Sequence, residues 1–243
     1  ACNLASLNLM KFINDDETFD IKSFKNAVRV TAIAQDLFID NSSYPTKKIA
    51  INSHKFRPLG MGYANLGSLV MSLGLAYDSD EARAVAAAIT ALQTGKVYET
   101  STEMAEKLGA FKEFEKNKKP MLNVMKMHRD ALSGIDRDKL PKGLENILYE
   151  AEKTWDNVIK RGEKYGFRNA QATVLAPTGT IGFFMDCDTK GIEPEIGLVQ
   201  TKLLSDGGTL RLVNSTIEKV LPKLGYCLLY TSPSPRDLST SRM

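Results

Sequence analysis

The sequence has few of the residues that build metal centres and disulfide frameworks. Its 243 residues include only three cysteines and two histidines, namely Cys2, Cys187, Cys227, His54 and His128. No pair of them has the spacing of a zinc site, so a zinc ion held by these side chains is not expected. Sparse and widely separated cysteine is typical of a reducing compartment rather than of a secreted disulfide framework. We therefore expect a cytoplasmic protein.

Long apolar runs and a large excess of one charge are also missing. No apolar run approaches the roughly 18 residues that a membrane-spanning helix requires. The formal net charge is only +3, which is too small to argue for nucleic-acid binding. Apolar residues make up 43% of the chain and charged residues 25%, as in a globular protein. We therefore expect neither a membrane nor a nucleic acid as a partner.

The end of the sequence differs from the rest. After Tyr226 the chain is rich in serine and proline and shows no hydrophobic periodicity. The sequence of this end resembles a translated sequencing adapter. We expect residues 1–226 to form the folded part and residues 227–243 to be a non-native, disordered tail, with a natural disordered tail as the alternative. In either case Cys227 is not expected to be functional.

Residues 172–184 are the stretch around which the rest of the chain is organised. Val174 and Leu175 are apolar, and residues 172–176 predict a buried strand. This strand should end at Pro177, which has no N–H group and suits a strand exit or the first turn of a helix.

A turn of small residues follows that strand. Thr178 and Thr180 offer hydroxyl groups, and Gly179 and Gly182 let a ligand approach the backbone. Free N–H groups at the start of a helix attract anions, phosphate above all. The turn is therefore a candidate phosphate site, and an ordinary strand-to-helix connection is the alternative.

Hydrophobic spacing predicts several helices and two further strands. The predicted helices cover residues 21–39, 82–92, 97–108, 121–132, 144–165 and 214–224, and the strands cover 1–9 and 198–204. Asp78 is predicted to cap the second helix, with Glu81 completing a capping box. Gly109 is predicted to end the third helix, and Pro120 to close an exposed stretch before the fourth.

Other patterns are given structural interpretations. The basic run 47–58 predicts a solvated face, with a nearby anionic ligand as the alternative. The glycines of residues 60–67 do not have dinucleotide-fingerprint spacing, and we expect them to permit close packing or backbone contact. The polar residues 185–194 predict a turn rather than a metal site. His128 is interpreted as a structural or surface residue.

Four separate strings resemble the large catalytic chain of ribonucleotide reductase. They are CNLASLNL at residues 2–9, RPLGMGYANLG at 57–67, MHRD at 127–130 and RNAQATVLAPTGTIG at 168–182. The wording is most similar to the adenosylcobalamin-dependent class of that family, and the resemblance runs from residue 1 to about residue 226.

The resemblance implies an α/β fold, a ten-stranded α/β barrel made of two parallel five-stranded halves. Residues 1–226 would hold much of the second half with its surrounding helices. The implied oxidoreductase reaction replaces the ribose 2′-hydroxyl group with hydrogen and supplies deoxyribonucleotides for DNA synthesis. A cysteine thiyl radical starts it, and two other cysteines become a disulfide. A ribonucleoside-diphosphate reductase is implied, while the choice between diphosphate and triphosphate stays open.

The resemblance also assigns residues and partners. Cys2 matches one member of the redox-active cysteine pair. The loop matched to the substrate phosphates consists of Pro177, Thr178, Gly179, Thr180 and Ile181. The implied cofactor is adenosylcobalamin, and the implied partners are a ribonucleotide and thioredoxin or a similar dithiol. The parent enzyme would be a homodimer or a monomer.

The radical cysteine of the family lies in an Asn-x-Cys-x-Glu string that would precede Cys2. That string is not in this sequence, so we expect the chain alone to be inactive although its parent is an enzyme. Two other interpretations stay open. In one, the chain belongs to an iron-dependent reductase, which shares the barrel. In the other, it is a nucleotide-phosphate-binding module without chemistry.

Overall fold

A computed structural model describes residues 1–203 and 207–226. The α-helices, in chain order, are α1 (Ile21–Asn41), α2 (Lys47–Phe56), α3 (Leu66–Ser72), α4 (Asp80–Leu108), α5 (Phe114–Ala131), α6 (Glu145–Tyr165), α7 (Thr180–Phe184) and α8 (Ile217–Lys223). The strands are β1 (Asn3–Asn8), β2 (Leu59–Ala64), β3 (Val199–Leu203) and β4 (Thr209–Val213). Three short 3₁₀ helices are η1 (Leu9–Phe12), η2 (Leu132–Gly134) and η3 (Arg137–Lys139).

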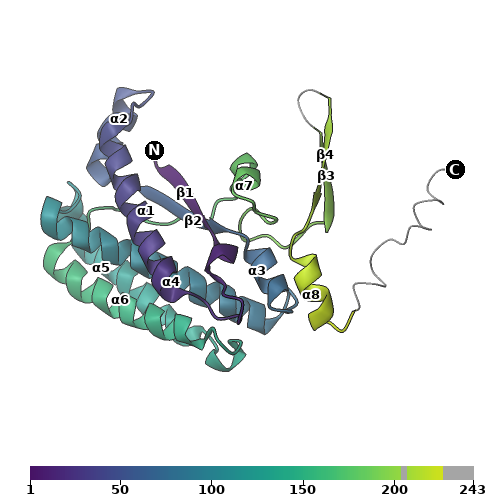
Figure 1. Ribbon diagram of the computed structural model, residues 1–243. Helices are drawn as coiled ribbons and strands as arrows, with labels where there is room; N and C mark the ends of the chain where they lie inside the picture. Colours follow the sequence, from purple (N-terminus) through teal and green to yellow (C-terminus); the bar gives the residue numbers. More distant parts are fainter. Residues whose placement is uncertain (204–206, 227–243) are drawn as a thin grey trace.

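β1 and β2 form a parallel pair in the middle of the molecule (Figure 1). The segment that follows α6 continues this sheet on the far side of β2, where Thr173 bridges Met61 in the parallel sense. The Met61 amide donates to the Ala172 carbonyl at 3.1 Å, and the Val174 amide donates to the Met61 carbonyl at 3.0 Å. A parallel sheet with helical connections confirms the α/β class.

The strand predicted over residues 172–176 is therefore only partly right. The segment is extended and pairs with β2, but a single bridge at Thr173 is its only regular pairing within the described residues. Val174 and Leu175 are half-buried rather than buried. The reason is that helices cover one face of the segment while its other face stays open.

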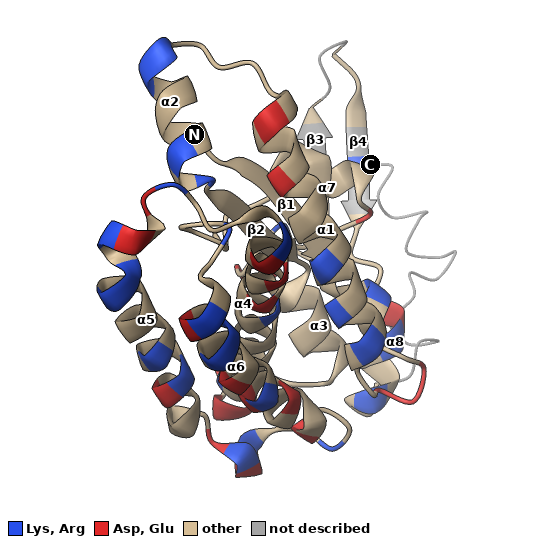
Figure 2. Ribbon diagram, turned by 90° about the vertical axis from the view of Figure 1, so that its left-hand side faces the viewer, with Lys and Arg blue, Asp and Glu red and all other residues tan. Residues whose placement is uncertain are grey.

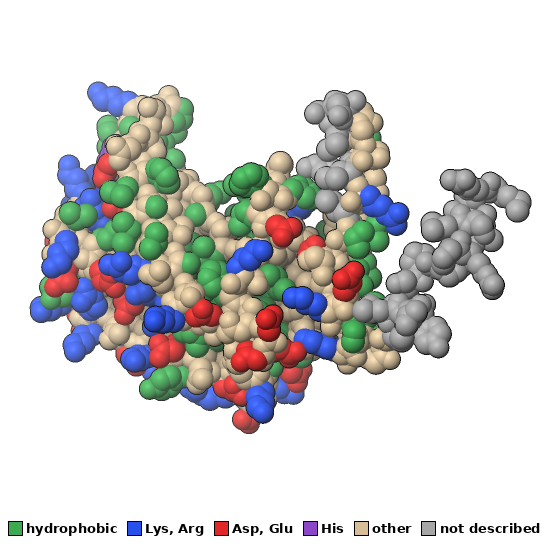
Figure 3. Space-filling model, viewed as in Figure 1, with side chains coloured by type: hydrophobic (Ala, Val, Ile, Leu, Met, Phe, Trp, Pro, Cys, Tyr) green, Lys and Arg blue, Asp and Glu red, His purple; other side chains and the backbone are tan. Residues whose placement is uncertain are grey.

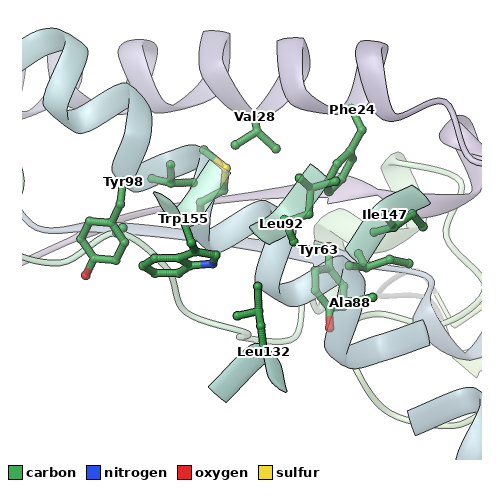
Figure 4. Close-up of a cluster of buried hydrophobic side chains, with 14 of the residues drawn as sticks. Phe24, Val28, Tyr63, Ala88, Leu92, Tyr98, Leu132, Ile147 and Trp155 are labelled. Carbon is green, nitrogen blue, oxygen red and sulfur yellow. The ribbon is translucent and has the colours of Figure 1, made fainter. Parts of the chain in front are cut away.

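Helices α1, α4, α5 and α6 form a layer on one face of the sheet (Figure 1). Leu59, Met61 and Tyr63 alternate along β2 and turn their side chains into this layer, each at most 1% exposed. Trp155 of α6 lies in the core against α4, donating from Nε1 to the Ala91 carbonyl at 2.9 Å (Figure 4). The core is thus built between the sheet and the helices.

Two predicted helices are one. The ranges 82–92 and 97–108 belong to the continuous helix α4, and Ser79 caps it by accepting from the Ala82 amide at 3.1 Å. The predicted cap at Asp78 is wrong because that carboxylate pairs instead with Arg83 at 2.6 Å. Gly109 ends the helix with a φ of 83°, as predicted.

Pro120 does not close the exposed stretch before α5 but lies inside that helix. Phe114, Met121 and Met125 are buried on one side of α5, so packing of this apolar face outweighs the loss of one N–H group. The helices predicted at 21–39 and 144–165 are confirmed as α1 and α6, and the strand at 1–9 as β1. The strand at 198–204 and the helix at 214–224 correspond to β3 and α8, while β4 was not predicted.

The basic run 47–58 forms α2 and the entry to β2. Lysines lie at both ends of α2, whereas α5 and α6 carry charges of both signs (Figure 2). Arg57 departs from the predicted solvated face, because it is 5% exposed and binds both Asp36 and Asp40. This residue holds the sheet to α1.

The glycines of residues 60–67 permit the close backbone contact that was predicted. A Cβ atom at Gly62 would lie 2.5 Å from the Val174 carbonyl oxygen, and one at Gly67 would lie 2.8 Å from the Glu193 carbonyl oxygen. Backbone therefore approaches backbone at both positions, which confirms the expectation for this stretch.

Two short sheets are seen in the described part of the chain, so the ten-stranded barrel remains an expectation from the resemblance. The predicted tail at residues 227–243 and the first half of the predicted turn at 205–208 lie outside the described residues. None of the described helices combines the length and the apolar character that crossing a bilayer demands.

Candidate functional site

The predicted phosphate loop lies at the carboxyl end of the parallel strands. It joins the segment that pairs with β2 to α7, and the Asn8 side chain at the end of β1 donates to the Met185 carbonyl just after α7 at 3.1 Å. In open α/β sheets, ligands bind at this edge. The surface is hollowed here between α2 and the hairpin of β3 and β4, with hydrophobic side chains around α7 (Figure 3).

The loop is closed on itself by Thr178. Its amide donates to the Lys190 carbonyl at 2.7 Å and its hydroxyl donates to the same oxygen at 2.9 Å. The Cys187 amide also donates to the Gly182 carbonyl at 2.9 Å. Residues 178–190 therefore form a small closed unit that carries α7.

The backbone at the start of α7 suits an anion. Gly179 precedes the helix with a φ of 60°, a conformation that glycine adopts without strain. The first N–H groups of any helix have no acceptor within it, so those of Thr180 and Ile181 are available to a ligand. Thr180 and Ile181 are both exposed.

The two predicted hydroxyl groups are not equivalent. The Thr178 hydroxyl donates its one hydrogen to the Lys190 carbonyl, so it cannot also donate to a phosphate. The Thr180 hydroxyl, in contrast, belongs to an exposed residue.

Lys190 is a cation beside this loop that the sequence reasoning missed. Its ammonium nitrogen lies 4.4 Å from the centre of the Phe183 ring in α7. The only signal in the sequence was its place in a polar stretch that was interpreted as a turn.

Cys2 lies at the other end of the strands. It is exposed and directly precedes β1, and strand alternation places it on the open face of the sheet with Leu4 and Ser6. Ala5 pairs with Met61, which bridges Thr173, so Cys2 and the loop are separated by roughly 20 Å along the strands. The structure does not bring these two predicted sites into contact.

Cys187 is a buried thiol near α7. Its burial and the adjacent Asp186 and Asp188 raise its pKa to about 11, so the thiol is protonated at neutral pH. The described residues hold Cys2 and Cys187 as free thiols and contain no cluster of metal-ligating side chains.

Each of the two histidines lies beside a side chain of another helix. His128 stacks on Trp155 with ring centres 5.2 Å apart, and burial lowers its pKa. His54 lies 3.6 Å from the Asp40 carboxylate on the surface of α2. The stacking on Trp155 agrees with the interpretation of His128 as a structural or surface residue.

Comparison with known proteins now defines the class and the family. A parallel α/β sheet with a loop of glycine and threonine at its carboxyl edge places that loop where proteins of this class bind ligands. Residues 1–232 match the family model described as "Ribonucleotide reductase, barrel domain". The chain belongs to the ribonucleotide reductase family.

Curated relatives agree with this assignment. The vitamin B12-dependent ribonucleotide reductase of Rhodopirellula baltica is 55% identical over 226 residues, covering 93% of this chain and 21% of that protein. The protein of the same name from Streptomyces coelicolor is 47% identical over 231 residues, covering 93% of this chain and 24% of its own length. The ribonucleoside-diphosphate reductase large chain of Encephalitozoon cuniculi is 28% identical, covering 92% of this chain and 27% of its own length. The chain thus spans about a fifth to a quarter of these relatives.

Proposed function

We propose that this chain is the substrate-phosphate part of the barrel of an adenosylcobalamin-dependent ribonucleotide reductase. The observation that carries the proposal is the closed unit 178–190, which places the start of α7 at the carboxyl edge of the sheet. The family of the chain supports the same proposal. The cobalamin-dependent class is favoured because relatives with that name share 42% to 55% identity, against 28% for the diphosphate reductase chain.

The substrate would be a ribonucleotide whose terminal phosphate lies on Pro177, Thr178, Gly179, Thr180 and Ile181. The amides of Thr180 and Ile181 and the Thr180 hydroxyl would donate to its oxygens. The Lys190 ammonium adds positive charge beside the loop. The ribose would then extend away from α7 along the open face of the sheet.

Cys2 would act as one of two thiols that reduce the substrate. The 2′-hydroxyl group leaves as water, the ribose carbon gains hydrogen, and the two thiols lose their hydrogens and form a disulfide. The only other described thiol, Cys187, is buried on another element, so the second thiol would come from outside the described residues. A dithiol such as thioredoxin would restore the pair.

Adenosylcobalamin would supply the radical that starts the reaction. Neither histidine of this chain lies at the loop, and His128 is held against Trp155. We therefore assign no described residue to the corrin.

The redox role is tested in a full-length reductase that carries this segment. We expect Cys2→Ser to lower turnover with a dithiol by at least about 100-fold, because the disulfide cannot form. Cys187→Ala is the matched control, since it keeps a small buried residue and should retain turnover. Unchanged turnover in Cys2→Ser would favour a binding module without chemistry.

The binding role is tested separately. Thr180→Val removes one phosphate donor and should raise KM for the ribonucleotide about tenfold with little change in kcat. The isolated chain, assayed with ribonucleotide, adenosylcobalamin and dithiol, should form no deoxyribonucleotide. Measurable product from it would contradict the proposal that the radical cysteine lies elsewhere.

A further inference from the structure

Asn65, between β2 and α3, makes contacts that neither the motif analysis nor the proposed function uses. It is 1% exposed and has a φ of 70°, in the left-handed region that asparagine tolerates better than most residues. A buried asparagine in this conformation needs partners for its amide group. The partners of this side-chain amide lie on two segments, the loop after α7 and the end of β1.

The first segment is held at Thr189 by both backbone and side chain. The Asn65 amide donates to the Thr189 carbonyl at 2.9 Å, and the Thr189 amide donates to the Asn65 side-chain oxygen at 2.9 Å. The Leu66 amide donates to the Gly191 carbonyl at 3.3 Å, and the Ser68 amide to the Thr189 hydroxyl at 3.4 Å. Thr189 is itself 3% exposed.

The second segment is the end of β1. The Asn65 side-chain nitrogen donates to the Asn8 side-chain oxygen at 2.8 Å, and Asn8 donates in turn to the Met185 carbonyl at 3.1 Å. The amide groups of Asn65 and Asn8 therefore connect β1 and β2 to both ends of the segment 185–189.

Thr189 directly precedes Lys190, whose carbonyl receives both hydrogen bonds of Thr178. A contact at Thr189 is thus one residue from the contact that closes the phosphate loop. We infer that Asn65 is a positioning residue that fixes the loop 177–181 relative to the ends of β1 and β2. This inference rests on the proposed function of the loop and adds what determines its position.

The test uses Asn65→Gly in the full-length reductase that carries this segment. Glycine keeps the left-handed backbone without strain, so the variant removes only the side-chain contacts. Because two buried hydrogen bonds are lost, we expect the dissociation constant of the ribonucleotide to rise about 10- to 100-fold. The affinity for adenosylcobalamin should stay within about twofold of wild type.

Asn65→Asp supplies the conservative variant, since its carboxylate still accepts from the Thr189 amide and tolerates the same backbone. We expect it to recover part of the lost affinity. Asn14→Gly is the matched control, because Asn14 is exposed and its recorded hydrogen bonds stay within its own turn, with Glu17 and Thr18. It should bind nucleotide like wild type.

A second measurement does not depend on nucleotide. Hydrogen exchange at the Thr178 amide should speed up at least about tenfold in Asn65→Gly, while amides in the middle of α4 stay protected. If Asn65→Gly does not fold, Asn8→Ser removes the Met185 contact from the other side and is measured in the same way.

Unchanged affinity and unchanged exchange at Thr178 would overturn the inference. A fall in cobalamin affinity equal to the fall in nucleotide affinity would also overturn it, because that result indicates general damage. If the wild-type reductase binds no ribonucleotide, the proposed function fails and the substrate part of the inference fails with it. The exchange result then decides whether Asn65 holds the loop.

Discussion

At the scale of single residues, Arg57 makes more side-chain hydrogen bonds than the other residues in the part of the chain that the structure describes. Its Nε donates to Asp36 at 2.9 Å, and its two terminal nitrogens donate to Asp40 at 2.7 and 2.8 Å. Asn169 precedes the segment that pairs with β2, and its side-chain nitrogen donates to the same Asp36 oxygen at 2.8 Å. These contacts join α1, the start of β2 and the start of the segment that leads to the loop.

We expect Arg57→Met to lower the free energy of unfolding by about 3–5 kcal/mol, because it leaves Asp36 buried without its main counter-charge. Chemical denaturation of the protein measures this loss. Arg83→Met is the control, since Arg83 makes exposed ion pairs with Asp78 and Asp80 and should change stability by less than about 1 kcal/mol.

The same substitution should change the pH dependence of stability. The hydrogen bonds from Arg57 hold the pKa of Asp40 below its ordinary value of 3.8. A carboxyl group with a lowered folded-state pKa stabilises the fold above its unfolded pKa and loses that contribution as the pH falls through its folded pKa. The wild-type protein should therefore lose stability in this acidic range more steeply than Arg57→Met. Parallel curves would contradict this assignment.

At the scale of elements, α4 and α6 pack closely against each other in the core. Gly95 lies in the middle of α4, and a Cβ atom there would come within 2.9 Å of Trp155 Nε1 and 3.0 Å of its Cδ1. Trp155 is fixed in turn by its bond to the Ala91 carbonyl. Gly95 lies in the gap between the predicted helices 82–92 and 97–108. The helix continues through this glycine, and the close approach of Trp155, not a turn of the chain, accounts for the glycine.

Gly95→Ala should therefore destabilise the protein by about 1–2 kcal/mol, because overpacking outweighs the better helix propensity of alanine. Trp155 is the only tryptophan of the chain, so its fluorescence reports the displacement directly. Gly134→Ala serves as control, since nothing lies within 4 Å of a Cβ atom there. Equal melting temperatures for the two variants would show that Trp155 moves aside at no cost.

At the scale of the whole molecule, one face of the sheet carries helices and the other is open. Large apolar side chains are exposed around the open face and the hairpin, among them Leu4 at 64%, Phe184 at 91% and Ile196 at 87%. Exposed apolar surface of this kind marks an interface. It agrees with a chain that spans a fifth to a quarter of its relatives.

Phe184→Ser should leave the stability of the isolated chain within about 0.5 kcal/mol of wild type, because the ring is already in solvent. It should reduce aggregation of the isolated chain but destabilise a full-length reductase that carries this segment. Phe24→Ser, at a fully buried position, should cost about 3–5 kcal/mol in both. Calorimetry compares the two variants, each in the isolated chain and in the full-length reductase, with wild type. A large loss of stability for Phe184→Ser in the isolated chain would contradict the open face.

Local sequence patterns were sufficient for the amphipathic helices α1 and α6, for β1 and for the glycine that ends α4. Each depends on neighbours within one or two turns, so periodicity and capping residues predict it. The same holds for the turn at residues 177–181, whose glycine and hydroxyl residues stand together in the chain. The resemblance of this stretch to the reductase family predicts the proposed function without any tertiary information.

Only the tertiary structure decided what depends on distant partners. Burial of Arg57 against Asp36, retention of Pro120 inside α5 and the bonding of Asn65 to Thr189 all join residues whose pairing no local pattern encodes. The separation of Cys2 from the phosphate loop is of the same kind, because strand register sets it. The sequence by itself predicted a phosphate site at residues 177–181, from the glycine and hydroxyl residues of the turn. The structure determined how that loop is held, because long-range hydrogen bonds form only after the chain has folded.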